Sequence, residues 1–214
     1  YHLSYSRAIS AIATACVHKD SRKNPGISVK LSALHPRYEV AQEASVMRDL
    51  VPRLRALALL AKSAGMGLNV DAEEADRLGL SLDVMEKVLS EPALSGWDGF
   101  GIVVQAYGPR AGVVIDALYD MAIRHDRKLM VRLVKGAYWD TEVKRAQVKG
   151  VEGFPVFTQK AATDVSYIAN ARKLLNMTDR IYPQFATHNA HTVAAILHMA
   201  GDERETFEFQ RLHG

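Results

Sequence analysis

The fold of this chain is decided by the stretch Lys128-Leu-Met-Val-Arg-Leu-Val-Lys-Gly-Ala-Tyr-Trp-Asp140. Its first half is an apolar run without an alternating polar face, which is typical of a strand buried in a parallel sheet. Arg132 interrupts this run, and a buried guanidinium needs a polar partner because its desolvation is costly. Lys135, Tyr138 and Trp139 then crowd the exit of the strand. The stretch therefore predicts a buried strand that delivers functional side chains at its carboxyl end.

Further apolar segments along the chain show the same arrangement of a run closed by a polar group. We predict strands at 26–31, 66–71, 100–105, 181–186 and 206–212, in addition to the strand at 128–134. The polar groups at or near their ends are Lys30, Asp71, Gln105, the turn Thr187-His188-Asn189, and Gln210. Because the carboxyl ends of parallel strands lie at the same rim, we expect these side chains to line one pocket.

The segments between the strands predict helices near 2–18, 40–63, 81–90, 110–125, 139–149, 158–176 and 189–200. This strand-then-helix order indicates a parallel sheet with right-handed crossovers. An open dinucleotide-binding sheet would carry Gly-x-Gly-x-x-Gly after its first strand, and residues 32–37 lack that pattern. The sequence therefore favours a (β/α)8 barrel of the TIM type, with about six of the eight strands present. We expect one barrel domain over residues 1–214 that is truncated at both ends.

The composition excludes several classes of protein. With 214 residues and 48% hydrophobic content, the chain can bury a sizeable core. Its 27 basic and 24 acidic side chains are dispersed and leave a net charge of +3, so we predict no nucleic-acid binding. Cys16 is the single cysteine, which excludes an internal disulfide and fits a reducing cytosol. No apolar run approaches the ~18 residues needed to cross a bilayer, and the first residues lack the features of a signal peptide.

Two pairs of side chains are the first candidates for chemistry. Lys30 and Asp71 close neighbouring predicted strands, so we expect an ion pair that holds the ammonium group in place. The competing interpretation is a purely structural bridge. His188 and His191 lie three residues apart at a predicted helix start, but no cysteine cluster or His-Glu-x-x-His motif supports a metal site. We predict no metal there; the polar turn is better suited to a phosphate at a helix N-terminus.

The exit of the strand at 128–134 suggests an anionic ligand. Arg132, Lys135 and the Gly136-Ala137 turn form a candidate anion cradle, and Tyr138-Trp139 offers flat surfaces for a ring system. Together they indicate a large cofactor with a diphosphate and an aromatic ring. An alternative is a Schiff-base lyase that uses Lys30 or Lys135. A second alternative is a non-catalytic barrel fragment that serves as a scaffold or sensor.

Five strings of residues resemble the proline dehydrogenase family, most closely the dehydrogenase domain of its bifunctional bacterial flavoenzymes. They are Val29-Lys-Leu-Ser-Ala-Leu-His-Pro-Arg-Tyr38, Asn69-Val-Asp-Ala-Glu-Glu74, Val104-Gln-Ala-Tyr107, Arg132-Leu-Val-Lys-Gly-Ala-Tyr-Trp-Asp140 and Tyr182-Pro-Gln-Phe-Ala-Thr-His-Asn-Ala-His191. The strings follow in order through nearly the whole chain. The resemblance implies a distorted (β/α)8 barrel that binds FAD and oxidises L-proline to Δ1-pyrroline-5-carboxylate.

The resemblance also implies partners and a location. The reduced flavin would pass its electrons to a membrane quinone, and the full-length chain would carry a pyrroline-5-carboxylate dehydrogenase domain. We therefore expect a cytoplasmic protein that associates peripherally with the inner membrane. No nucleic acid is expected to bind this segment.

The family's functional residues match individual positions of this chain. The resemblance places Arg132 near the flavin N5 and Gln105 at the flavin ring, and it places Lys30 at the carboxylate of proline. Asp71 and Tyr138 match active-site residues, the tyrosine packing against the substrate. The other implied FAD contacts are Val134, Lys135, Gly136, Ala137, Trp139 (beside adenine), Thr158, Lys160, Thr187, His188, Asn189, Gln210 and Leu212.

The ends of the chain depart from the family pattern. In the family, an arginine pair on the last barrel helix clamps the substrate carboxylate, and this sequence ends at Gly214 before that helix. It also begins after the family's first strand. We therefore expect these residues alone to bind proline poorly and not to form a stable closed barrel.

Overall fold

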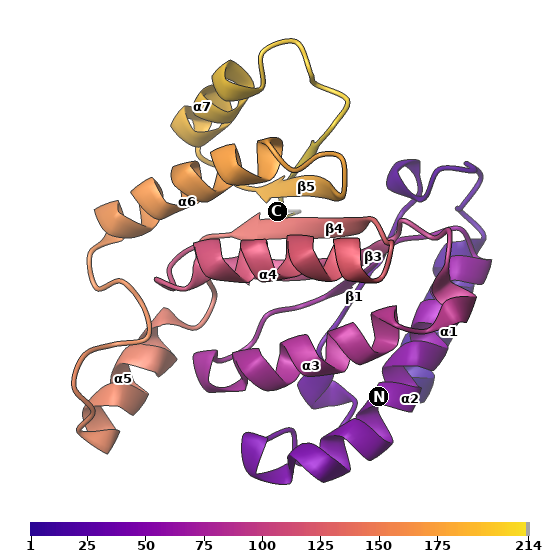
Figure 1. The fold of residues 1–214 in the computed structure, drawn as a ribbon, viewed down its shortest axis with the longest axis horizontal. Coiled ribbons are helices and arrows are strands. Elements are labelled where there is room, and N and C mark those ends of the chain that lie inside the picture. The colour runs from indigo at the N-terminus through magenta and orange to yellow at the C-terminus, as the bar shows by residue number, and fades with distance from the viewer. Residues whose placement is uncertain (213–214) are drawn as a thin grey trace. The chain divides into compact units, whose positions relative to one another are not determined.

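Strands and helices alternate along the chain in a computed structural model that describes residues 1–212 (Figure 1). The strands are β1 (Ile27–Val29), β2 (Leu68–Val70), β3 (Phe100–Gln105), β4 (Leu129–Val134), β5 (Ile181–Ala186) and β6 (Glu208–Gln210). The α-helices are α1 (His2–Ala13), α2 (Glu43–Ser63), α3 (Leu78–Leu89), α4 (Ala111–Arg124), α5 (Trp139–Lys149), α6 (Lys160–Leu175) and α7 (Ala190–Ala200). Short 3-10 helices are η1 (Ser21–Lys23), η2 (Leu31–Ala33), η3 (Val40–Gln42), η4 (Ala75–Arg77) and η5 (Pro92–Leu94).

The strands form one sheet in the order of the sequence, β1-β2-β3-β4-β5-β6. Strand β2 pairs in parallel with β1 and with β3, and β5 pairs in parallel with β6. Sequential parallel strands joined by helices are the arrangement of a TIM-type barrel, here with six of the eight strands. The predicted fold class is confirmed.

Two compact units divide the chain. Unit 1 contains Tyr1–Ile102 and Met121–Leu129, and unit 2 contains Val103–Asp120 and the chain from Met130 onward. The core of unit 1 is built on α2, which buries one face against α1 and α3. The buried positions follow the spacing of an amphipathic helix, because residues three and four apart lie on one side. They are Val46, Leu50, Leu54, Leu57, Ala58 and Ala61.

The core of unit 2 includes a buried tyrosine that joins a helix to two strand ends. Tyr167 of α6 is fully buried, and its hydroxyl lies 3.0 Å from the Leu133 carbonyl and 3.1 Å from the Ala186 carbonyl. Phe185, Phe207 and Phe209 pack around β5 and β6 with ring centroids 5.5 to 6.2 Å apart. These contacts fix the carboxyl ends of β4 and β5, where the candidate site lies.

Element boundaries differ from the sequence-based predictions at a few ends. Helix α1 stops at Ala13 rather than near residue 18. Just beyond it, the Thr14 hydroxyl donates to the Ala11 carbonyl at 2.8 Å, which competes with continuation of the backbone ladder. Within residues 1–212, no helix combines the length and the apolar character that a membrane span requires.

Candidate functional site

Strand β4 delivers Arg132 as the sequence predicted. The burial of its residues alternates toward the end of the strand, so that Arg132 and Val134 are partly accessible while Leu133 is buried. Arg132 is therefore half-buried, and the expectation of a buried guanidinium is wrong, because side chains on its face of the strand are partly accessible at this end. The expected polar partner exists: Arg132 Nε donates to Gln210 Oε1 of β6 at 2.6 Å.

The exit of β4 is a turn that only glycine can form. Gly136 has a φ of +142°, and a Cβ atom added there would lie 2.3 Å from the ring of Tyr107. The following Ala137 N–H donates to Gln105 Oε1 at 3.1 Å, and the Tyr107 N–H donates to the Lys135 carbonyl at 2.7 Å. The end of β3 therefore holds the backbone of the predicted anion cradle in place.

Two lysines of the predicted cofactor site share one carboxylate. Asp164 Oδ1 lies 2.5 Å from Lys135 Nζ, and Asp164 Oδ2 lies 2.7 Å from Lys160 Nζ. Hydrogen bonds from Lys135 and then Lys160 hold the pKa of the Asp164 carboxyl below its ordinary value. The same carboxylate raises the pKa of Lys160. The structure thus brings two cations together at the start of α6, where the helix dipole also favours an anion.

An exposed indole lies at the start of α5. Trp139 is 41% exposed, and its Nε1 donates to the Phe157 carbonyl at 2.9 Å. The hydrogen bond fixes the orientation of the ring while one surface stays available for stacking. Tyr138 is half-buried as the N-cap residue of α5, and Thr158 is exposed next to the anchoring carbonyl.

The turn between β5 and α7 is organised by its own side chains. Asn189 caps α7, because its Oδ1 accepts the Thr192 N–H at 2.9 Å. The Asn189 N–H donates to Thr187 Oγ1 at 3.0 Å. His188 Nε2 accepts the Leu212 N–H at 3.2 Å, so the neutral imidazole carries its hydrogen on Nδ1. Thr187 Oγ1 and Asn189 Oδ1 therefore shape the turn that leads into α7.

A groove of about 540 Å³ lies between α6 and α7 in unit 2. Apolar side chains of α6 line it together with polar side chains of both segments. Its lining residues are Asp164, Val165, Ile168, Ala169, Arg172, Asn189, His191 and Thr192. Both Asp164, which pairs with the two lysines, and Asn189, which caps α7, are therefore among the groups that a ligand in the groove could meet.

The predicted ion pair between Lys30 and Asp71 is present in unit 1. Lys30 Nζ lies 3.3 Å from Asp71 Oδ2, and the two residues follow β1 and β2 directly. The side chains are 48% and 25% exposed, so this ion pair is accessible to solvent. Both residues lie just beyond their strands, where the chain turns toward solvent. Glu73 Oε1 also accepts the Ser32 N–H at 3.0 Å and joins the two loops.

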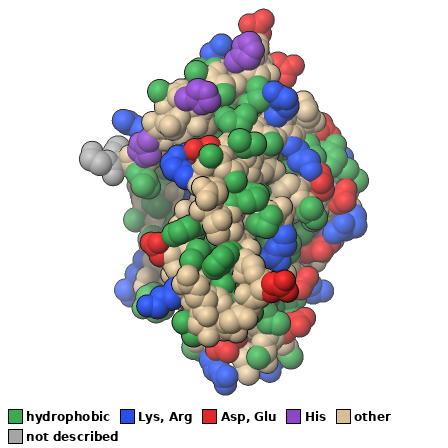
Figure 2. Space-filling view, turned by 90° about the vertical axis from the view of Figure 1, so that its left-hand side faces the viewer, with side chains coloured by type: hydrophobic (Ala, Val, Ile, Leu, Met, Phe, Trp, Pro, Cys, Tyr) green, Lys and Arg blue, Asp and Glu red, His purple; other side chains and the backbone are tan. Residues whose placement is uncertain are grey.

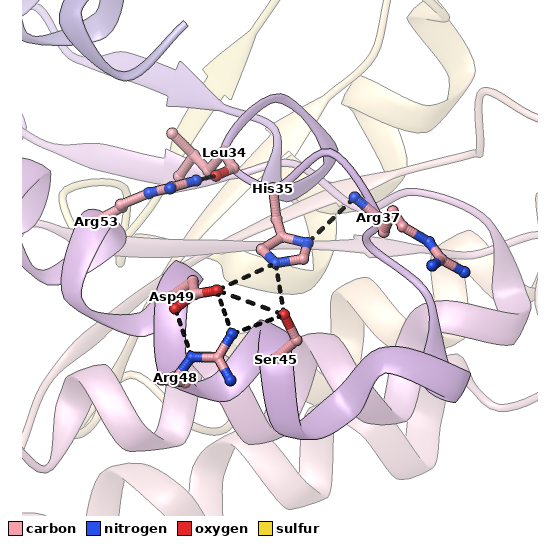
Figure 3. A network of polar contacts seen from close by, with 7 residues as sticks. All are labelled: Leu34, His35, Arg37, Ser45, Arg48, Asp49 and Arg53. Carbon is pink, nitrogen blue, oxygen red and sulfur yellow. Dashed lines mark hydrogen bonds and ion pairs between the residues drawn. The ribbon is translucent and has the colours of Figure 1, made fainter.

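A buried histidine fixes the loop that follows Lys30 (Figure 3). His35 is only 6% exposed, and its Nδ1 accepts the Arg37 N–H at 3.2 Å. On the other side of the ring, Nε2 lies 3.4 Å from Ser45 Oγ of α2. Because Nδ1 is an acceptor, the neutral ring carries its hydrogen on Nε2, which faces Ser45. Arg53 of α2 also donates to the backbone of this loop.

The arrangement in unit 2 suits a cofactor that combines a diphosphate with aromatic rings. Two ammonium groups, the N-termini of α6 and α7, and an exposed indole supply the donors and the stacking surface. Among residues 1–212, no cluster of three or more His, Cys, Asp or Glu side chains could hold a metal ion. On the face shown in Figure 2, basic and acidic side chains are interspersed rather than gathered by sign.

The fold is that of an incomplete TIM-type barrel, and its candidate site offers the groups that a large anionic cofactor would need. The family model for proline dehydrogenase matches residues 1–214, and the chain belongs to that family. Bifunctional protein PutA of Salmonella typhimurium is 58% identical over 216 residues, which cover 100% of this chain and 16% of that protein. The chain therefore spans about a sixth of the length of that curated relative.

Solved structures agree with this membership. A variant of Bradyrhizobium japonicum proline utilization A matches with a TM-score of 0.97 and 58% identity, over 100% of this chain and 22% of that one. Proline utilization A from Bdellovibrio bacteriovorus, inactivated by N-propargylglycine, matches with a TM-score of 0.90 and 31% identity. That match covers 99% of this chain and 24% of the other.

Sequence reasoning missed several polar residues of unit 2. Asp164 follows Lys160 by four residues on α6. Helical side chains at this spacing are neighbours, so the sequence alone indicates this ion pair. Glu208 lies two residues before Gln210 and shares its face of β6. Gln184 sits in an apolar strand, where a polar side chain needs a partner. The contacts of Lys30 with Asp71 and of Lys135 with Asp164 also weigh against the Schiff-base alternative, because a carboxylate partner favours the charged ammonium and the nucleophile must be a neutral amine.

Proposed function

We propose that this protein oxidises L-proline to Δ1-pyrroline-5-carboxylate with bound FAD and passes the electrons to a membrane quinone. The observation that carries the proposal is the match to the proline dehydrogenase family over residues 1–214. The cationic and aromatic groups of unit 2 support it, because they suit the parts of FAD that need a protein partner. Identity of 58% with a solved bifunctional proline utilization A protein supports the same substrate.

Bound FAD would accept a hydride from the ring carbon next to the proline nitrogen. Arg132 would stabilise the negative charge that the flavin gains, since a preorganised cation costs no rearrangement at that moment. Gln105 and the turn from Val134 to Ala137 would contact the flavin, with Gly136 allowing close approach of the backbone. Gln210 and Leu212 would complete these contacts.

The remaining cofactor residues would hold the outer part of FAD. Lys135 and Lys160 would neutralise the diphosphate, to which Thr158 and the turn Thr187-His188-Asn189 would add hydrogen-bond donors. Trp139 would stack beside the adenine, because its indole is fixed at Nε1 and exposed on one surface.

Lys30 would bind the carboxylate of proline, and the ion pair with Asp71 would keep its ammonium group oriented. Tyr138 would pack against the proline ring. Only the neutral amine has an electron pair to assist hydride departure, so cations near the substrate would favour catalysis by lowering the amine pKa. Lys30 and Tyr138 would also hold proline in a fixed orientation, so that the reaction would proceed as if it were intramolecular.

The relatives suggest how the product is used. The PutA relatives are described as bifunctional, and this chain corresponds to 16% of the Salmonella protein. We propose that the natural full-length protein also carries a pyrroline-5-carboxylate dehydrogenase activity, which would consume the product. Electron delivery to a quinone would require transient association with the inner membrane from the cytoplasmic side.

Absorption spectroscopy of the full natural protein tests the proposal. The purified protein should show a flavin spectrum, and anaerobic L-proline should bleach it, while a quinone analogue should restore it. The Bdellovibrio relative is inactivated by N-propargylglycine, a carboxylate-bearing secondary amine like proline, so this compound should bleach the flavin irreversibly. A protein without flavin, or a flavin that proline leaves oxidised, would refute the proposal.

A further inference from the structure

Four polar side chains form a connected chain across β4, β5 and β6. Arg132 Nε donates to Gln210 Oε1 at 2.6 Å, and Gln210 Nε2 donates to Glu208 Oε1 at 2.6 Å. The same oxygen of Glu208 accepts Gln184 Nε2 at 2.9 Å. Gln184 is 5% exposed and is the registered partner of Glu208 in the parallel pair of β5 and β6. Glu208 is thus the acceptor at the centre of the chain.

The chemistry of these groups permits one orientation of the Gln210 amide. An ionised carboxylate only accepts hydrogen bonds, and a guanidinium only donates them. The NH2 group of Gln210 must therefore face Glu208, which leaves Oε1 to face Arg132. The reverse orientation would set two donors against each other at Arg132 and two acceptors against each other at Glu208. Glu208 thereby determines which atom Arg132 meets.

We propose that Glu208 is a positioning residue that holds Arg132 in place through Gln210. This inference rests on the proposed function, in which Arg132 stabilises the reduced flavin. The intervening amide of Gln210 links the Glu208 carboxylate to Arg132 and orients Nε of the guanidinium. The register of β5 and β6 places these groups, because Gln184 and Glu208 are paired while Gln210 lies two residues further along β6.

Two substitutions of similar volume separate positioning from packing. Glu208→Gln can still accept both amide hydrogens, whereas Glu208→Met fills the same space but accepts none. In the full FAD-loaded protein, we expect Glu208→Met to make reduction of the flavin at least tenfold less favourable. This change equals a fall of about 30 mV in the midpoint potential of a two-electron couple. Reduction by proline should slow by a similar factor, with FAD content retained, and Glu208→Gln should stay within about threefold of the native protein on both measures.

Spectroelectrochemistry of the bound flavin and stopped-flow reduction provide these readouts. If Glu208→Met has the midpoint potential and reduction rate of the native protein, the inference is wrong. It is also wrong if Glu208→Met and Glu208→Gln lose equally on both measures, because the effect would then come from the lost charge. If Met prevents folding, Glu208→Asp replaces it: the carboxylate is kept but withdrawn by one methylene, and the potential should again fall. Glu205→Met, at an exposed position, is the matched control and should behave like the native protein. If the native protein binds no FAD, both the proposed function and this inference are wrong.

Discussion

Asp164 is a carboxylate within a site that is otherwise suited to an anion. Lys135 and then Lys160 lower its pKa, so the two ion pairs stabilise the folded state at pH values above the unfolded pKa of about 3.9. This contribution is lost as the pH falls through the lowered pKa of the folded state. We expect Asp164→Asn to lower Tm at pH 7 by a few degrees at most, because the pairs are partly exposed.

A pH series of thermal unfolding checks this prediction. The difference in Tm between the native protein and Asp164→Asn should shrink to zero as the solution is acidified. Asp202→Asn, at an exposed turn, serves as the control and should show no comparable difference at any pH. A difference that persists in acid would mean that Asp164 acts through packing rather than through its charge.

Arg132 offers the most direct test of the flavin site. Arg132→Met keeps the apolar stem of the side chain and removes its charge, so the fold should persist. Loss of one preorganised group that stabilises developing charge slows reactions by about 10² to 10³ fold. We expect a decrease of this size in the rate of flavin reduction by proline, measured by stopped flow. The exposed Arg204→Met is the control, and near-native reduction in Arg132→Met would remove this residue from the mechanism.

A substitution at Gly136 changes the shape of the turn that follows β4 without changing its charge. Ala at this position would combine a φ of +142° with a Cβ atom 2.3 Å from the Tyr107 ring. We expect Gly136→Ala to destabilise the protein by about 1 to 3 kcal/mol and to weaken FAD retention. Chemical denaturation and flavin content measure the two effects. Gly153→Ala is a matched control, since Gly153 also has a positive φ but no atom within 4 Å of its added Cβ.

At the residue scale, the sequence identified the charged groups but not their partners. Arg132 in an apolar run predicted the need for a polar partner, because desolvation of a guanidinium is costly on any fold. The partner itself, Gln210, lies 78 residues away, and only the strand order brings it close. For Asp164, the spacing of four residues from Lys160 indicates one ion pair on α6. Its second partner, Lys135, follows β4, and only the fold brings it beside the carboxylate.

Among the elements, the turn before α7 depends on a single side chain. Asn189 Oδ1 accepts the Thr192 N–H, which is one of the backbone donors that a helix leaves unsatisfied at its start. Asn189→Ala should therefore cost about 1 kcal/mol in the free energy of unfolding, measured with urea. Asn189→Asp retains the acceptor and should restore most of this loss. Equal losses in both variants would show that the amide has a role other than capping.

Strand positions were predictable because burial requires an apolar run, but strand lengths were not. Strands β3 and β5 match the predicted segments 100–105 and 181–186. Strands β1 and β2 are shorter than predicted, since they end at Val29 and Val70. One further backbone bond joins them, from the Asp71 N–H to the Val29 carbonyl at 2.9 Å, before the chain enters the loops. The length of an apolar run indicates how many residues are buried. The hydrogen-bond ladder of a strand instead ends where the backbone turns away from the neighbouring strand. That second property depends on tertiary contacts such as the Ser32 to Glu73 hydrogen bond.

Across the whole molecule, the order of elements was enough to predict the fold class, because parallel strands joined by helices have few solutions. The division into two units was not predictable, since no linker or shift of composition marks it. It nevertheless sorts the candidate residues. The charged substrate residues Lys30 and Asp71 belong to unit 1, whereas Tyr138 and the residues proposed to hold the cofactor belong to unit 2. Substrate and cofactor binding should therefore respond to different substitutions.

Lys30→Met tests this separation. It removes the ammonium group that we assign to the proline carboxylate and leaves the cations of unit 2 unchanged. We expect the KM for proline to rise at least tenfold, because a charge-assisted hydrogen bond is worth about 1.5 to 3 kcal/mol. The Kd for FAD, measured by titration of the apoprotein, should stay within about twofold. Lys23→Met, at an exposed position in η1, controls for loss of a lysine from the same unit. The opposite pattern, with FAD affinity lost and KM unchanged, would move Lys30 from the substrate to the cofactor.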